Sequence, residues 1–180
     1  MQKHVISLLA RDVHSSPSRV CTLLAQRQIA ISSLQFSEAA EHGAWWIQLA
    51  VEVDDSAMLG LLINRLNRLI DVTEVVALPS GTAHYRQSVF VTLTPVAPAE
   101  RDGILGIAAM FGAELLSSPP DEVQLHLCAD PVRCSRFVTA LERHTPTEVR
   151  YGALSAIRAS ATRPAEGRDC GDGSARSGAA

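Results

Sequence analysis

The sequence has little of what marks membrane, secreted or nucleic-acid-binding proteins. No stretch approaches the run of about 18 apolar residues that a membrane span requires. The 16 lysines and arginines are outnumbered by 19 aspartates and glutamates, and the net charge of −3 offers no basic field for nucleic acid. The N-terminus enters a strand pattern without the apolar segment and cleavage site of a signal peptide. We therefore expect a cytoplasmic protein that has neither nucleic acid nor a membrane as its partner.

The cysteines also lack the paired spacing of a disulfide framework, which predicts reduced thiols at Cys21, Cys128, Cys134 and Cys170. A metal site is geometrically conceivable because His126 and Cys128 share a face of a predicted strand, with Cys134 six residues further on. A fourth ligand at sensible spacing is missing, and Cys134 fits the apolar stripe of a predicted helix better. Cys21 lies inside another predicted helix, where burial would raise the pKa of its thiol and lower its reactivity as a nucleophile. We predict neither a metal site nor a catalytic residue.

Apolar residues make up 47% of the sequence, enough for real hydrophobic cores, and they follow two different periods. The change of period is clearest around Asp71. Before it, apolar residues recur at the spacing of one helix face, at Leu59, Leu62, Ile63, Leu66 and Ile70. After it, the run Val72–Leu78 is β-branched and apolar, too short for another helix. A strand that follows a helix so directly is expected to pack back over it.

The first 80 residues predict the order strand, helix, strand, strand, helix, strand. The strands are expected at His4–Ala10, Ile29–Phe36, Trp45–Val53 and Val72–Leu78, with a polar turn at Glu38–Gly43. The first helix is expected to start with Ser16 as its cap and Pro17 at its first position, and to end near Gln28 with Val20, Leu23, Leu24 and Arg27 on one face. The second helix begins at Ser56. This order is the ferredoxin-like arrangement of the α+β class, with both helices on one side of an antiparallel sheet.

The same order recurs after a polar connection at Gly81–Gln87. Strands are predicted at Ser88–Thr94, Ala113–Ser117, Val123–Ala129 and Glu148–Tyr151. Helices are predicted at Pro98–Phe111, ended by Gly112, and from Asp130-Pro131 onward with Cys134, Phe137, Val138 and Leu141 facing inward. The predicted domains are therefore residues 1–80 and 88–158, joined by a linker at 81–87. From Ala159 the sequence lacks periodicity and bulky apolar residues, which predicts a disordered tail over 159–180.

Several stretches resemble the small regulatory subunit of acetolactate (acetohydroxyacid) synthase. The run from Leu66 to Val75, L-N-R-L-I-D-V-T-E-V, is similar to the family's second helix and fourth strand. His4–Asp12 and Ile31–Leu34 resemble its first and second strands, and Asp121–Leu127 and Glu148–Gly152 resemble signatures of its second half. The resemblance covers about residues 4–158. It implies two ferredoxin-like βαββαβ domains, an N-terminal ACT domain and an ACT-like C-terminal domain.

The resemblance also implies a function without catalysis by this chain itself. A regulatory subunit of this kind activates an acetolactate synthase catalytic subunit in the biosynthesis of valine, leucine and isoleucine. Thiamine diphosphate, magnesium and FAD are expected on that catalytic subunit, and no cofactor is expected on this chain. We also expect a homodimer through the ACT domains, because open sheet edges leave backbone donors and acceptors to be paired. The alternative is a free-standing ACT-type small-molecule sensor that is no longer tied to acetolactate synthase.

The family usually confers feedback inhibition by valine, and the resemblance implies where that effector binds. The candidate residues lie after the first strand and, from the other protomer, at the entry to the second: Asp12, Val13, His14, Ser15, Ser16, Ala30 and Ile31. Ser15 stands where the family has a glycine, and serine resists the close backbone approach that glycine permits. Ala30 stands where the family has an asparagine, and alanine supplies neither its donor nor its acceptor. We therefore predict that valine feedback is weakened or lost.

Overall fold

The chain folds into two four-stranded antiparallel sheets, each with two α-helices, in a computed structural model that describes residues 2–12, 14–40, 43–53, 55–79 and 81–159. Sheet A has the strand order β2-β3-β1-β4 and sheet B the order β6-β7-β5-β8. The strand order and the helix positions are the same in both halves, which confirms the predicted α+β fold of two ferredoxin-like units. Within the described residues, no helix combines the length and the apolar character needed to cross a membrane.

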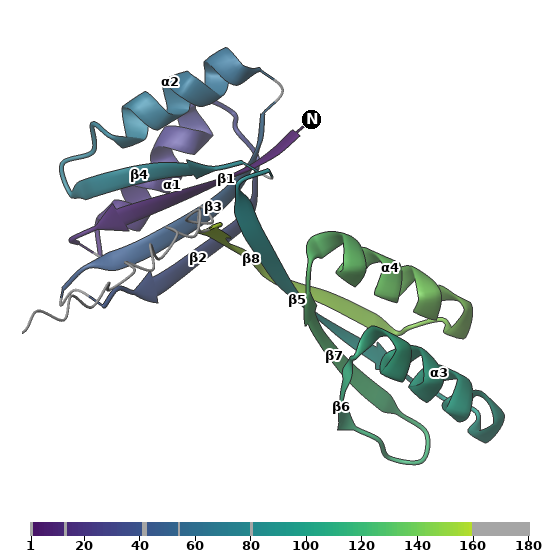
Figure 1. The fold of residues 1–180 in the computed structure, drawn as a ribbon. Helices are drawn as coiled ribbons and strands as arrows, with labels where there is room; N and C mark the ends of the chain where they lie inside the picture. Colours follow the sequence, from purple (N-terminus) through teal and green to yellow (C-terminus); the bar gives the residue numbers. More distant parts are fainter. Residues whose placement is uncertain (1, 13, 41–42, 54, 80, 160–180) are drawn as a thin grey trace, which may run out of the picture.

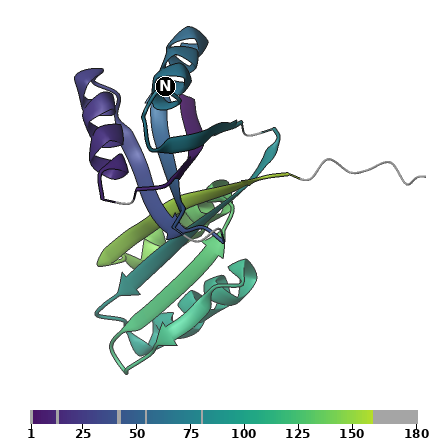
Figure 2. The same cartoon turned by 90° about the vertical axis from the view of Figure 1, so that its left-hand side faces the viewer.

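Sheet A comes from the first half of the chain. Its strands are β1 (Gln2–Ala10), β2 (Ile31–Glu38), β3 (Trp45–Val53) and β4 (Val72–Leu78). Helices α1 (Ser16–Gln26) and α2 (Ser56–Leu66) cover one of its faces, as Figures 1 and 2 show. The alternation of β1 places Ile6, Leu8 and Ala10 under these helices, where they pack with α1 and α2 residues such as Val20, Leu24, Leu62 and Leu66. The predicted inward face of the first strand is confirmed.

Sheet B comes from the second half. Its strands are β5 (Ala83–Leu93), β6 (Glu114–Ser117), β7 (Val123–Ala129) and β8 (Glu148–Arg158), and its helices are α3 (Pro98–Phe111) and α4 (Pro131–Leu141), the latter followed by the single turn η1 (Glu142–His144). Gly112 ends α3 in the left-handed conformation, with φ +67°, as predicted.

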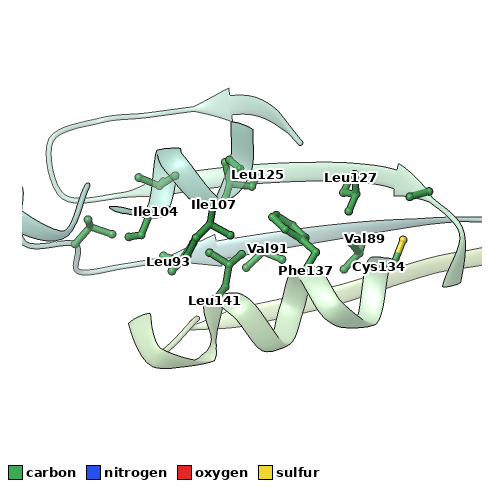
Figure 3. Packing of buried hydrophobic residues seen from close by; sticks show 14 residues of the cluster. Val89, Val91, Leu93, Ile104, Ile107, Leu125, Leu127, Cys134, Phe137 and Leu141 are labelled. Atoms are coloured by element: carbon green, nitrogen blue, oxygen red, sulfur yellow. The ribbon is translucent and has the colours of Figure 1, made fainter. Parts of the chain in front are cut away.

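The core of the second half lies between sheet B and its two helices (Figure 3). Phe137 of α4 is fully buried against residues of β5 and β7, and its ring centroid lies 5.4 Å from that of Phe111. Cys134 and Leu141 are fully buried on the same side of α4, and Val138 packs against the cluster. The predicted inward face of this helix is therefore confirmed. Burial of a phenylalanine or leucine side chain contributes about 1.5–3 kcal/mol to stability, because its apolar surface is removed from water.

Two helix ends differ from the prediction. The N-cap of α1 is Ser15, and Ser16 lies inside the helix, so Ser16 as the cap was wrong. The helix ends two residues early because the chain turns at Gln28, which has a positive φ of 55°, and Arg27 is exposed. The stripe of α2 does not extend to Ile70, which is 90% exposed. Asn67 already caps α2, the chain turns there, and Leu69 contacts the core in place of Ile70.

The predicted linker is largely strand. β5 begins at Ala83, five residues before the predicted Ser88, and β8 continues to Arg158, seven residues beyond Tyr151. The added segments, residues 83–87 of β5 and 154–158 of β8, pair with each other and form what we call the ribbon. The ribbon lies against the face of sheet A that the helices leave uncovered (Figures 1 and 2). Of the predicted tail, Ala159 donates its N–H to the Thr82 carbonyl at 2.9 Å, and residues 160–180 lie outside the described residues.

Side chains of sheet A bind the free backbone edge of β8. The Gln48 amide accepts the Ala156 N–H at 3.0 Å and donates to the Ala156 carbonyl at 2.6 Å, as a neighbouring strand would. The Leu154 N–H donates to Ser33 Oγ at 2.8 Å. Around these bonds a small apolar cluster includes Val5 and Leu78 of sheet A. The edge of β8 is thus satisfied inside the molecule instead of being left open.

Candidate effector site

The loop between β1 and α1 is organised by the Asp12 carboxylate. Its Oδ1 accepts the His14 backbone N–H at 2.8 Å, and its Oδ2 accepts the Ser15 hydroxyl at 2.6 Å. These two hydrogen bonds, the one from Ser15 first, hold the pKa of Asp12 below its ordinary value of 3.8. The loop therefore keeps its shape by directing polar groups at its own carboxylate.

A second carboxylate, that of Asp71, reaches the same loop from the turn just before β4. The Ser15 hydroxyl lies 3.2 Å from Asp71 Oδ2, and Arg19 forms an ion pair with the same oxygen. The Asp71 carbonyl accepts the Arg11 N–H at 2.9 Å, which holds the start of β4 beside the end of β1. Asp71 and Arg19 were not predicted as site residues. Arg19 could have been predicted, because a residue four positions after Ser15 lies on the same side of a helix. Asp71 could not, because only the pairing of β4 with β1 brings it to this loop.

Ser16 offers a polar group that the protein itself leaves unused. The residue is 1% exposed, and its Oγ has no hydrogen-bond partner among the described residues. Its backbone N–H donates to the Asp12 carbonyl at 3.2 Å. A buried hydroxyl without a partner costs free energy, which a bound water molecule beside Ser16 would relieve.

One protomer does not bring the two parts of the predicted site together. Ile31 lies opposite Val51, which in turn lies opposite His4, near the start of β1. Asp12 follows the other end of β1, Ala10, which lies six residues beyond His4 and roughly 20 Å away at the rise of a strand. Ala30 and Ile31 are exposed at the edge of sheet A. Val13 lies outside the described residues.

The three residues considered above as metal ligands lie on opposite sides of sheet B. Cys134 is buried in the core, where burial raises the pKa of its thiol and its Sγ donates to the Gln87 carbonyl at 3.2 Å. His126 lies on the other side, with its ring stacked on Phe90 at a centroid distance of 4.5 Å, and Cys128 is exposed. Cys134 therefore cannot join the other two around one ion.

Comparison with known proteins identifies the class of the first unit. Residues 17–75 match the family model of the ACT domain, and this segment holds α1, β2, β3, α2 and the start of β4. This part of the chain is therefore similar to an ACT domain.

The particular resemblance is to small subunits of acetolactate synthase. The chain is 22% identical over 142 residues to the acetolactate synthase small subunit of Aquifex aeolicus, covering 79% of this chain and 73% of that protein. It is also 22% identical over 158 residues to the chloroplastic acetolactate synthase small subunit 2 of Arabidopsis thaliana, of which it spans 32%. The crystal structure of the Thermotoga maritima acetolactate synthase small subunit superposes with a TM-score of 0.78 at 15% identity, covering 89% of this chain and 99% of that one. The resemblance expected from the sequence is confirmed, and so is the fold.

Proposed function

We propose that this chain is a regulatory subunit of acetolactate synthase, which binds a catalytic subunit and raises its activity in branched-chain amino-acid biosynthesis. The observation that carries the proposal is the superposition of both halves, in one arrangement, on 99% of an acetolactate synthase small subunit. Thiamine diphosphate, magnesium and FAD would then be bound by the catalytic subunit.

The edge of sheet A supports a homodimer through the ACT domains. β2 is an edge strand, and its large side chains Ile31 and Phe36 are 37% and 40% exposed. Antiparallel pairing of two β2 strands would satisfy their backbone groups and cover these side chains. Such pairing would also carry the Ile31 end of one strand to the Glu38 end of the other, the end nearer Asp12. The two parts of the effector site would then meet across the dimer, as proposed.

The loop geometry supports a weak response to valine. A bound amino acid needs donors for its carboxylate, yet Asp12 already accepts the His14 N–H and the Ser15 hydroxyl. The guanidinium of Arg19 is paired with Asp71. Two carboxylates of the protein therefore use the donors and the positive charge that a ligand carboxylate would require at this helix start.

The experiment is reconstitution with the acetolactate synthase catalytic subunit of the same genome. The two chains are mixed in the presence of thiamine diphosphate, magnesium and FAD, and acetolactate formation is followed with and without valine. We expect co-purification, a severalfold rise in acetolactate formation over the catalytic subunit alone, and little change when valine is added. Failure of the two chains to associate would contradict the proposal.

The alternative, a free-standing sensor, is supported by the similarity of residues 17–75 to an ACT domain, which does not require acetolactate synthase as the partner. Calorimetric titration of the isolated chain with valine, leucine and isoleucine separates the two. Tight binding of an amino acid by a chain that does not associate with a catalytic subunit would favour the sensor.

A further inference from the structure

A groove lies between the uncovered face of sheet A and the ribbon, and it shares no residue with the predicted effector site. Its volume is about 910 Å³, near the upper end of the range of about 300–1,000 Å³ found for small-ligand pockets. Trp46 and Val76 of sheet A and Ile157 of the ribbon give it an apolar lining. Both halves of the chain contribute, and the boundary between two domains is a preferred place for ligand sites.

The charges around this groove are unbalanced. The ribbon contributes Arg86, Arg158 and His84, whereas Glu74 of β4 is the one carboxylate in the described lining. Arg86 donates to the Tyr85 carbonyl at 2.8 Å, and no ion pair joins Arg86 or Arg158 to a carboxylate in the described part of the chain. Arg86 and His84 lie on one face of the ribbon with Ile157, since residues two apart on a strand and residues paired across it share a face. Arg158 is paired with Ala83 and lies on the other face.

We propose that the groove binds a small organic anion with an apolar body, of the class of medium-chain carboxylates. Arg86 binds the anionic head, because a guanidinium group forms paired hydrogen bonds with a carboxylate. Trp46, Val76 and Ile157 contact the apolar body. The inference does not depend on the proposed function, since it rests only on the lining of this groove.

The chain offers its own reporter for the test. The sequence has two tryptophans. Trp46 lines the groove, whereas Trp45 is paired with Ala10, whose side chain lies on the helix-covered face. In a full-length Trp45→Phe protein, Trp46 is the single tryptophan. Titration with octanoate that carries bromine at its terminal carbon should quench Trp46 emission saturably, and the matching brominated octanol should bind at least about tenfold more weakly.

Charge variants in the same background give effects of opposite sign. Arg86→Gln should weaken binding of the brominated octanoate about three- to tenfold, the range expected for a partly exposed charged partner. Arg158→Gln, on the other face of the ribbon, should weaken it by less than about twofold. Glu74→Gln should strengthen it about two- to threefold by removing a like charge. Arg65→Gln, on exposed α2 surface, is the matched control and should leave binding unchanged.

Thermal unfolding of each variant verifies that the fold is retained. A merely structural role of these residues would not make Glu74→Gln bind more tightly while Arg86→Gln binds less tightly. Unsaturable quenching, equal quenching by the acid and the alcohol, or an Arg86→Gln variant that binds like the parent would overturn the proposal.

Discussion

Ser15 ties two carboxylates to the start of α1, and its hydroxyl is the first cause of the lowered pKa of Asp12. A lowered folded-state pKa means that the contribution of Asp12 to stability is fully present above its ordinary value of 3.8 and is lost as pH falls through the folded value. We predict that Ser15→Gly raises the pKa of Asp12 toward 3.8, because it removes the hydrogen bond that lowers this pKa most. Carbon-detected NMR titration of the carboxyl measures it, with Ser18→Ala as the control. An unchanged pKa would mean that the backbone N–H of His14 suffices.

The same residue bears on effector affinity. Ser15→Gly together with Ala30→Asn restores the family's residues at the two diverged positions. A hydrogen bond to a charged group contributes about 1.5–3 kcal/mol, so the double variant should bind valine roughly ten- to a hundredfold more tightly than the parent. Calorimetric titration with valine measures this gain. Each single variant serves as a control, and no gain in the double variant would place the effector elsewhere.

At the scale of the elements, α4 depends on one large side chain. Phe137 is fully buried between α4 and sheet B, so Phe137→Ala should lower the free energy of unfolding of this half by about 3–5 kcal/mol through lost burial and the cavity left behind. Val132→Ala on the same helix is the matched control, since Val132 is exposed and its loss should change stability by less than about 0.5 kcal/mol. Urea unfolding followed by circular dichroism measures both. Similar losses for the two variants would show that α4 is held by something other than this core.

The helices and strands also show which parts of the fold can be predicted from the sequence. Local periodicity predicted β3, β4, α3 and β7 with the bounds that the structure has, because alternation and helical spacing depend on neighbours in the chain. It failed at Ile70, because the helix ends at Asn67 although the helical spacing of apolar residues continues to Ile70. It failed again at residues 83–87, whose strand character comes from pairing with β8, about 70 residues away. Asp71 was missed as a site residue for the same reason, since only strand pairing brings it to Ser15.

At the scale of the whole molecule, the two halves are joined through polar side chains on the uncovered face of sheet A. Polar residues on a sheet face often have no role beyond contact with solvent. Here Ser33, Gln35 and Gln48 each form a hydrogen bond with the 154–156 segment of β8. The segment is still paired with β5, and it extends beyond the core of sheet B to reach sheet A (Figure 1). The position of the second half therefore depends on specific hydrogen bonds as well as on the small apolar cluster around Val5 and Leu78.

Gln48 is the residue on which this joint should depend most, because its amide makes both a donor and an acceptor bond to Ala156. Gln48→Leu keeps the approximate size but leaves the Ala156 N–H and carbonyl without those partners, at a cost of about 1–3 kcal/mol for unsatisfied groups. We expect faster hydrogen exchange at Ala156, weaker coupling between the unfolding of the two halves, and unchanged exchange inside the α3 and α4 core. Gln124→Leu on sheet B, a glutamine of similar partial burial, is the control. If exchange at Ala156 stays as slow as in the parent, the ribbon is held by its apolar contacts and the amide pairing is incidental.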